Sequence, residues 1–165
     1  MPGKETEQSA EKKTIGWREW VSLPELGIDR LKAKVDTGAR TSALHAFSVE
    51  PFQKPDGTDW VRFGVHPRQR SNATEIFCEA PIIDRRTVRD SGGHQEERFV
   101  ISTTVVLGPE SLTAEITLTA RDDMLFRMLL GRTSIRNRFV VDSSRSYAIG
   151  KKKRKKKNAK TGSKA

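Results

Sequence analysis

Asp36 is the residue whose setting points most clearly to chemistry. It ends an alternating apolar run over residues 31–35 and is followed by Thr37, Gly38 and Ala39. The alternation has the period of a half-buried strand, so the acid stands where that strand must turn. Gly38 permits a sharp turn and the close approach of another chain segment. A carboxylate presented in this way can act as a general acid or base, although Asp and Gly also occur together in ordinary turns.

A second short element stands much later in the chain, at Leu129, Leu130, Gly131 and Arg132. Asp-Thr-Gly-Ala followed by two apolar residues, Gly and Arg resembles the pattern of the retropepsins. The two elements occur in the retropepsin order, with β-rich sequence between them. The resemblance implies that the apolar pair packs behind the loop that holds Asp36. It also implies that the glycine lets strand and loop cross closely.

A closer resemblance covers roughly residues 15–147. The strings KVDTGARTSALHA, SGGHQEER and LLGRTSIRNRFVVDSSRSY are similar to one bacterial family of retropepsin-like aspartic peptidases. These are often labelled "ATP-dependent zinc protease" and are associated with the ligase that adds glutamates to a small-subunit ribosomal protein (the RimK/RimB-type system). The sequence does not support a zinc site, because it lacks His-Glu-x-x-His and its three histidines, His45, His66 and His94, are scattered. No metal and no cofactor are expected.

The resemblance implies a catalytic arrangement. An aspartic peptidase needs two carboxylates that share one proton, so that one activates water while the other protonates the carbonyl oxygen. This chain has one Asp-Thr-Gly, so Asp36 from each subunit of a homodimer would form the pair. Thr37 would hydrogen-bond across the interface, and the backbone of Gly38 would meet substrate. Ala39 lacks a hydroxyl that could stabilise ionised Asp36, which favours activity nearer neutral pH. Arg40 departs from the acidic residue common in viral retropepsins.

Retropepsins close over substrate with a Gly-rich hairpin tip. The preferred candidate for this flap is the loop Ser91, Gly92, Gly93 and His94 within residues 89–96, whose glycines would permit hinge motion. Residues 66–72 are the alternative, and an ordinary hairpin loop at residues 91–94 stays open.

The remaining pattern predicts an all-β protein: a closed retropepsin-like barrel with one short C-terminal helix at residues 133–138. Strands are expected at residues 14–22, 31–35, 43–49, 60–65, 75–83, 98–107, 112–120, 128–130 and 139–142. The first of these should form a hairpin with the second and so lead to Asp36.

The charge divides the chain. The formal net charge is +10, but residues 151–165 hold nine Lys and Arg and no acid, so the remainder carries only +1. We expect a disordered segment over residues 1–13, a peptidase domain over 14–149 and a disordered polybasic tail over 150–165. The tail could serve solubility, bind RNA or the ribosome, or attract a glutamate-extended substrate.

The sequence predicts a cytoplasmic protein, because it shows no membrane-spanning run and no signal peptide. The single cysteine, Cys78, is expected to be a buried strand residue. The favoured function is an aspartic endopeptidase that acts on a peptide or protein, and the resemblance implies a glutamate-extended ribosomal protein as the substrate. Two alternatives stay open: a non-catalytic barrel anchored to RNA or ribosomes by the tail, and a metal-dependent hydrolase.

Overall fold

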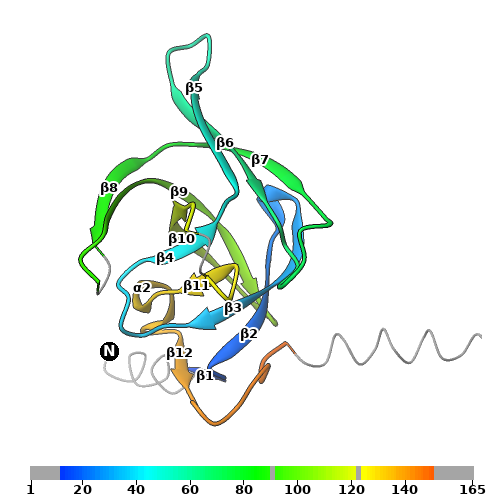
Figure 1. Ribbon diagram of the computed structural model, residues 1–165. Helices are drawn as coiled ribbons and strands as arrows, with labels where there is room; N and C mark the ends of the chain where they lie inside the picture. The colour runs from blue at the N-terminus through cyan, green and yellow to red at the C-terminus, as the bar shows by residue number, and fades with distance from the viewer. Residues whose placement is uncertain (1–11, 90–91, 122–123, 151–165) are drawn as a thin grey trace, which may run out of the picture.

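The computed structural model describes residues 12–89, 92–121 and 124–150. These residues form a mostly β structure with a single short α-helix (Figure 1). The elements are β1 (Lys13–Ile15), β2 (Arg18–Leu23), the 3-10 turn η1 (Pro24–Leu26), β3 (Ile28–Val35), β4 (Ser42–His45), β5 (Ser48–Gln53), β6 (Asp59–Val65), β7 (Ile76–Pro81), β8 (Asp84–Arg89), β9 (Gln95–Leu107), β10 (Glu110–Thr119), β11 (Met128–Leu130), α2 (Arg132–Ile135) and β12 (Phe139–Val141).

Six strands close into a barrel. They follow one another in the order β10-β4-β11-β3-β2-β9, and β9 pairs again with β10, which completes the ring. Strand β8 pairs with the outer part of β9 and takes no part in the closure. The predicted all-β barrel with one short helix is therefore confirmed.

Alternating side chains fill the barrel. Leu31 on β3, Leu44 on β4 and Ile116 on β10 are fully buried, and their strand neighbours on the opposite face are mostly polar. This alternation is why β10 and the β2–β3 hairpin lie close to where the period-two pattern predicts them. Closure leaves these six strands without the exposed edges that an open sheet would carry.

A second sheet, ordered β5-β6-β7, covers part of the same core through Val61, Phe63 and Cys78. The β5–β6 hairpin extends beyond the barrel and projects from the top of the molecule in Figure 1. A third, two-stranded sheet joins the ends of the described chain, because β1 pairs in parallel with β12.

Two predicted strands prove to be interrupted. Residues 14–22 divide into β1 and β2 at Gly16 and Trp17, where the backbone of Arg145 lies so close that a side chain at Gly16 would collide with it. Residues 43–49 divide after β4, and Pro51, which lies beyond the expected strand, is inside β5 opposite Val61. Pro51 is tolerated there because β5 is an edge strand.

Smaller differences occur near the chain ends. The predicted helix at residues 133–138 is only α2, and Asn137, with φ of 71°, turns the chain into β12. Strand β1 begins at Lys13, inside the segment expected to be disordered. Residues 1–11 of that segment, residues 151–165 of the tail, Ser91 and Asp122 lie outside the described residues. In the described part of the chain, no helix has the length and apolar character needed to cross a membrane.

Candidate active site

The loop that carries Asp36 spans a strand inserted beneath it. β3 and β4 follow each other in the chain, yet β11 lies between them, parallel to β3 and antiparallel to β4. The connection over residues 36–41 therefore arches across the end of β11 (Figure 1). Gly131 stands directly under the arch, where an added Cβ would lie 2.6 Å from the carbonyl carbon of Thr41. Only a residue without a side chain fits beneath the loop as it stands.

Backbone hydrogen bonds hold the arch at both ends. The Asp36 amide donates to the carbonyl of Leu130 at 2.9 Å, and the Ala39 amide donates to the carbonyl of Asp36 at 3.1 Å. On the other side, the Arg132 amide donates to the carbonyl of Ala39 at 2.8 Å. The guanidinium of Arg132 also donates from Nη1 to the carbonyl of Gly38 at 3.2 Å. The start of α2 and the end of β11 thus fix the loop backbone.

Small hydroxyl residues that sequence reasoning missed support the same arch from below. The buried Ser42 Oγ accepts from the Gly131 amide at 2.9 Å and lies 3.1 Å from the Oγ of Ser134. Thr133 donates through Oγ1 to the carbonyl of Arg40 at 2.9 Å. The only sequence signal for Ser42 was a polar residue in a strand that is otherwise buried.

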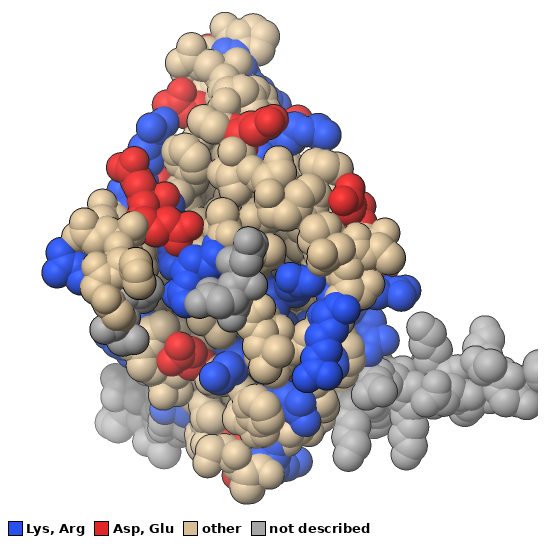
Figure 2. All heavy atoms as spheres, viewed as in Figure 1, with Lys and Arg blue, Asp and Glu red and all other residues tan. Residues whose placement is uncertain are grey.

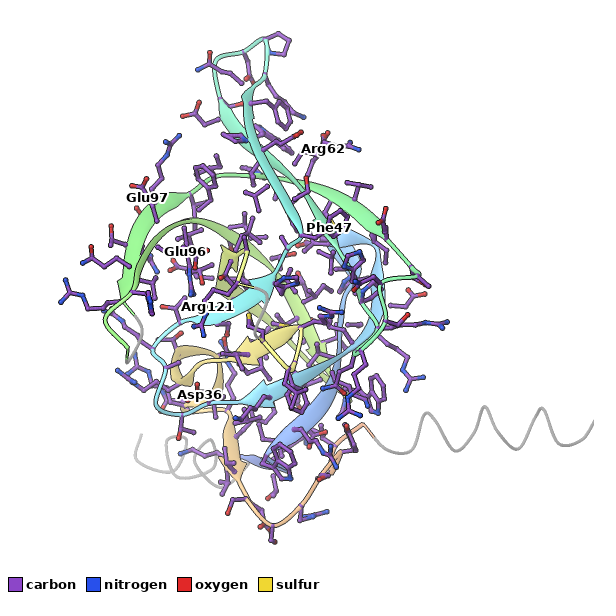
Figure 3. All side chains as sticks on the ribbon, viewed as in Figure 1. Asp36, Phe47, Arg62, Glu96, Glu97 and Arg121 are labelled. Carbon is purple, nitrogen blue, oxygen red and sulfur yellow. The ribbon has the colours of Figure 1, made fainter. Side chains whose placement is uncertain are left out.

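The Asp36 carboxylate is left available by this framework. The side chain is half-buried, and its Oδ1 accepts one hydrogen bond, from the Gly38 amide at 3.1 Å. Thr37 and Gly38 are exposed, and Ala39 is half-buried. Figure 3 shows Asp36 on the β3–β4 connection, beyond the opposite end of β4 from Phe47. A carboxylate on a fixed backbone, with accepting positions to spare, can bind water or exchange a proton.

The predicted supporting residues meet this loop, whereas the role of the predicted flap residues stays a prediction. Leu129 and Leu130 belong to β11, and Leu130 pairs with Val35 immediately before Asp36. Gly92, Gly93 and His94 form the turn between β8 and β9, and Gly93 has a φ of 90° that suits glycine.

The alternative flap, residues 66–72, is hydrogen-bonded to the barrel and to the segment before β11. Gln69 accepts from Lys32 Nζ at 3.2 Å and donates to the carbonyl of Leu125 at 3.0 Å. The β5–β6 hairpin, with its tip at residues 54–58, lies between the strands expected at residues 43–49 and 60–65, and its projection from the body was not predicted.

The histidines are not brought to one place. His45 and His66 are buried and line the same cavity, whereas His94 lies in the exposed β8–β9 turn. Among residues 12–89, 92–121 and 124–150, no group of three His, Cys, Asp or Glu side chains could hold a metal ion.

A closed barrel with a strand inserted beneath an Asp-Thr-Gly loop is a retropepsin-like fold. Residues 14–152 match the RimB-like family, described as "Retropepsin-like aspartic endopeptidase RimB". The chain belongs to that family.

The similar curated proteins are larger. The chain is 44% identical over 138 residues to a probable alpha-L-glutamate ligase of Shewanella pealeana, a match that covers 84% of this chain and 30% of that protein. It is 46% identical over 143 residues to a probable alpha-L-glutamate ligase of Desulfotalea psychrophila, which covers 87% of this chain and 31% of that protein. The chain therefore spans about a third of the length of these relatives.

A solved structure shares the fold. The crystal structure of a Legionella pneumophila protein of unknown function (DUF785) superposes with a TM-score of 0.69 at 25% sequence identity. The match covers 83% of this chain and 98% of that one.

Proposed function

We propose that this protein is an aspartic endopeptidase in which the Asp36 carboxylates of two copies activate a water molecule between them. The observation that carries the proposal is the fixed loop over Gly131, which presents a carboxylate with a single intramolecular hydrogen bond. Membership of a family described as aspartic endopeptidases supports the same chemistry.

One carboxylate is not sufficient for this reaction. The acid and the base must share a proton, and two like charges about 3 Å apart do so because both cannot ionise cheaply. With a single Asp-Thr-Gly in the chain, a two-fold axis is the simplest source of the second Asp36.

Asp142 and Asp122 could instead supply a second carboxylate from within the chain, and of these Asp122 lies outside the described residues. Asp142 accepts from the hydroxyl of Ser144 at 2.6 Å and from its amide at 3.0 Å. These two hydrogen bonds hold the pKa of Asp142 below its ordinary range. Because both hydrogen bonds already engage Asp142 with Ser144, this carboxylate is less suited to share a proton with Asp36, which favours the dimeric arrangement.

The sheet formed by β1 and β12 is the surface we propose for dimer contact. Within the described residues each of its strands has one neighbour, and Val140 on β12 is 51% exposed. Open strand edges and an exposed β-branched side chain suit pairing with a second copy.

The proposed substrate is a glutamate-extended polypeptide. Its support is that sequence similar to this chain makes up about a third of proteins named probable alpha-L-glutamate ligases. Two activities joined in one chain often act on a common substrate, so a peptidase beside a glutamate ligase would act on the ligase product. A ribosomal protein is the candidate carrier of that extension, and RNA contact through the tail stays a proposal.

A mixing experiment tests this mechanism. Wild-type chains are mixed with increasing amounts of Asp36→Asn chains, and cleavage of a glutamate-rich peptide is measured with and without a chelator. Activity should fall below the wild-type share, because mixed dimers lack one carboxylate, and chelation should have no effect. Asp142→Asn chains, as the matched control, should not poison the activity. Strict proportionality to the wild-type share would contradict the dimeric mechanism, and loss on chelation would favour a metal-dependent hydrolase.

A further inference from the structure

The β6–β7 connection, residues 66–75, runs along the barrel with a cavity on either side. One cavity, of about 740 Å³, lies between this connection and the β2–β3 hairpin. The other, of about 470 Å³, lies between it and the ends of β4 and β11. The first is lined by residues that include Trp20, Arg30, Lys32 and Arg68, and the second by His45, Phe47, His66, Arg70, Asn72 and Arg127.

Strand register places the polar residues of the two cavities at one level. Trp20 pairs with Lys32, the residue before Ala33, and Ala33 pairs with Met128. Arg127 precedes Met128, and its carbonyl accepts from the amide of His45 at 2.8 Å. Trp20, Lys32, Arg127 and His45 therefore follow one another across four adjacent strands, roughly 5 Å apart from strand to strand. We call this set the lateral row.

The β6–β7 connection adds further cations above the row. Arg127 donates from Nη2 to Asn72 Oδ1 at 3.1 Å and to the carbonyl of Ser71 at 3.4 Å. These hydrogen bonds hold the guanidinium of Arg127 against the β6–β7 connection. Arg70 has a φ of 65°, an unusual conformation for a residue with a side chain. Arg70 lines the smaller cavity together with the buried His45 and His66.

Positive charge prevails around both cavities. Arg30, Lys32, Arg68, Arg70 and Arg127 line them, whereas Asp29 is the acidic residue among the lining residues. Glu75 adds a second carboxylate, 3.5 Å from Nε2 of His66. Figure 2 shows Lys and Arg side chains gathered in the lower right part of the face in view, while Asp and Glu lie mostly in its upper part. This local excess of cationic over acidic residues contrasts with the formal net charge of +1 for all residues outside the tail.

We infer that the two cavities form a docking site for an acidic peptide segment, whose carboxylates contact these cations. The inference deepens the proposed function and rests on it for one point, that the segment belongs to a substrate cut at Asp36. Guanidinium groups match carboxylates in geometry as well as charge. Two cavities in line suit successive acidic side chains of an extended peptide better than one small anion.

The aromatic residues favour a peptide over single-stranded nucleic acid. Nucleic-acid grooves of this kind use free ring faces on which bases stack. Trp20 stacks on Tyr147 with centroids 5.6 Å apart, and the Arg30 guanidinium lies 3.9 Å from the Trp20 ring centroid. Phe47 stacks on His66 at 4.2 Å, and its ring covers Gly64. The rings are thus already engaged within the protein.

The position of the lateral row sets how long a bound peptide must be to reach Asp36. Lys32 precedes Asp36 by four residues on β3, so the row lies roughly 13 Å along the strand from the candidate catalytic acid. An extended peptide covers that distance with about four residues. The docking site should therefore act on substrates that have acidic residues at least that far from the cut.

Binding is tested on full-length chains carrying Asp36→Asn, so that no cleavage occurs, with fluorescent glutamate oligomers of two and eight residues as probes. One variant adds Arg30→Gln, Lys32→Gln and Arg70→Asn, since Asn tolerates the left-handed backbone at residue 70. A control variant adds Lys54→Gln, Arg62→Gln and Arg85→Gln, which remove the same charge outside both cavities. The first should weaken binding of the eight-residue oligomer at low salt by about tenfold and the control by less than about twofold.

The tail is identical in both variants, so equal weakening would mean that net charge alone drives binding and would overturn the inference. Unchanged binding would overturn it too, as would a larger loss for single-stranded RNA than for the glutamate oligomer. The two-residue oligomer should bind weakly to all three proteins, and the difference between variants should vanish at high salt.

Cleavage separates this inference from the proposed function. In chains that retain Asp36, the docking variant should lower the ratio of cleavage efficiency on a glutamate-rich substrate to that on a neutral peptide by about tenfold. An unchanged ratio would overturn the docking site while leaving the peptidase intact. If no peptide is cut by the wild type but the binding difference persists, the proposed function fails and the acidic-peptide site stands.

Discussion

Glu19 and Asp36 are carboxylates at the two strands of one hairpin, and they differ in burial and in the hydrogen bonds they accept. Glu19 on β2 is completely buried, opposite Ala33 of β3. Its oxygens accept from the amides of Gly16 at 2.7 Å, Ala148 at 2.8 Å and Ile149 at 3.3 Å. Asp36, just beyond β3, is half-buried and accepts one intramolecular hydrogen bond, from Gly38.

The contrast separates a structural acid from a reactive one. The Glu19 carboxylate itself accepts hydrogen bonds from the backbone amides of three residues, and these bonds hold residues 143–150 against the barrel. The backbone of the Asp36 loop is held instead by hydrogen bonds to Leu130 and Arg132, so the Asp36 carboxylate remains available to a ligand or water. Removing each carboxylate should therefore damage different properties of the protein.

The largest expected effect is on catalysis. Asp36→Asn should lower peptide cleavage by about a thousandfold or more, because an amide cannot share the proton that general acid–base catalysis requires. The unfolding free energy should hardly change, since Gly38 can still donate to the remaining oxygen. Initial rates and denaturant unfolding of the same preparations measure both. A protein that keeps more than a tenth of its activity would remove Asp36 from the mechanism.

Glu19→Ala should show the reverse. It leaves buried amides of Gly16, Ala148 and Ile149 without their acceptor, which should cost about 3 kcal/mol of unfolding free energy. Urea denaturation measures the loss, and cleavage per folded molecule should change by less than about threefold. Glu25→Ala is the matched control: its carboxylate accepts from Thr103 and Thr104 at 3.1 Å but is exposed, so the loss should be smaller. Equal losses would mean that burial is not what makes Glu19 structural.

The predictable parts of the molecule are those whose cause is local. The period-two pattern identifies β10, and the short apolar run Met128–Leu130 has the observed bounds of β11. The Asp36 turn and the use of Gly131 were also expected, because the two motifs carry a recognisable family pattern. Glu19 could not be anticipated, because the amides that bury it come from Ala148 and Ile149 at the other end of the chain.

The same reason explains the other surprises. Residue 16 must be glycine because the backbone of Arg145 packs against it, and Ser42 becomes part of the site because it contacts Gly131 and Ser134. Each contact joins residues about 90 or more positions apart in the chain. A single sequence indicates which residues are polar or small, but not which distant backbone they meet.

Gly131→Ala should affect both properties. Its Cβ would lie 2.6 Å from the carbonyl carbon of Thr41 and 2.9 Å from the carbonyl oxygen of Arg40, so the loop must move. Overpacking of this kind costs about 2 kcal/mol. The displaced loop should also lower cleavage, by about tenfold or more, because small misplacements of catalytic groups are costly.

Gly150→Ala is the control, because its Cβ would meet ordinary contacts at 3.7 and 3.8 Å, to Trp20. Stability and cleavage of this variant should stay close to the wild type. If Gly131→Ala lost stability but kept full activity, the arch over β11 would not be what positions Asp36.

Glu96 lies between the two extremes and sets the smallest effect, which depends on pH. Its side chain, labelled in Figure 3 beside the exposed Glu97, is 30% exposed. It accepts from Arg98 Nε at 2.9 Å, Thr119 Oγ1 at 2.8 Å and the Ala120 amide at 3.1 Å. Partial burial alone would raise its pKa, but these hydrogen bonds outweigh burial and hold the pKa of Glu96 below the ordinary value of 4.5.

A pKa lowered on folding stabilises the ionised folded protein. The contribution of Glu96 is therefore complete above the unfolded pKa and is lost as pH falls through the lower, folded value. Unfolding free energies should be measured for the wild type and Glu96→Gln from about pH 6 to about pH 2. The wild type should lose more stability than the variant over this range, whereas Glu97→Gln should follow the wild type. Other acids with lowered pKa values, such as Asp84 and Asp142, act equally in all three proteins and cancel in the difference. Parallel curves for the wild type and Glu96→Gln would show that the hydrogen bonds to Glu96 do not favour its ionised form.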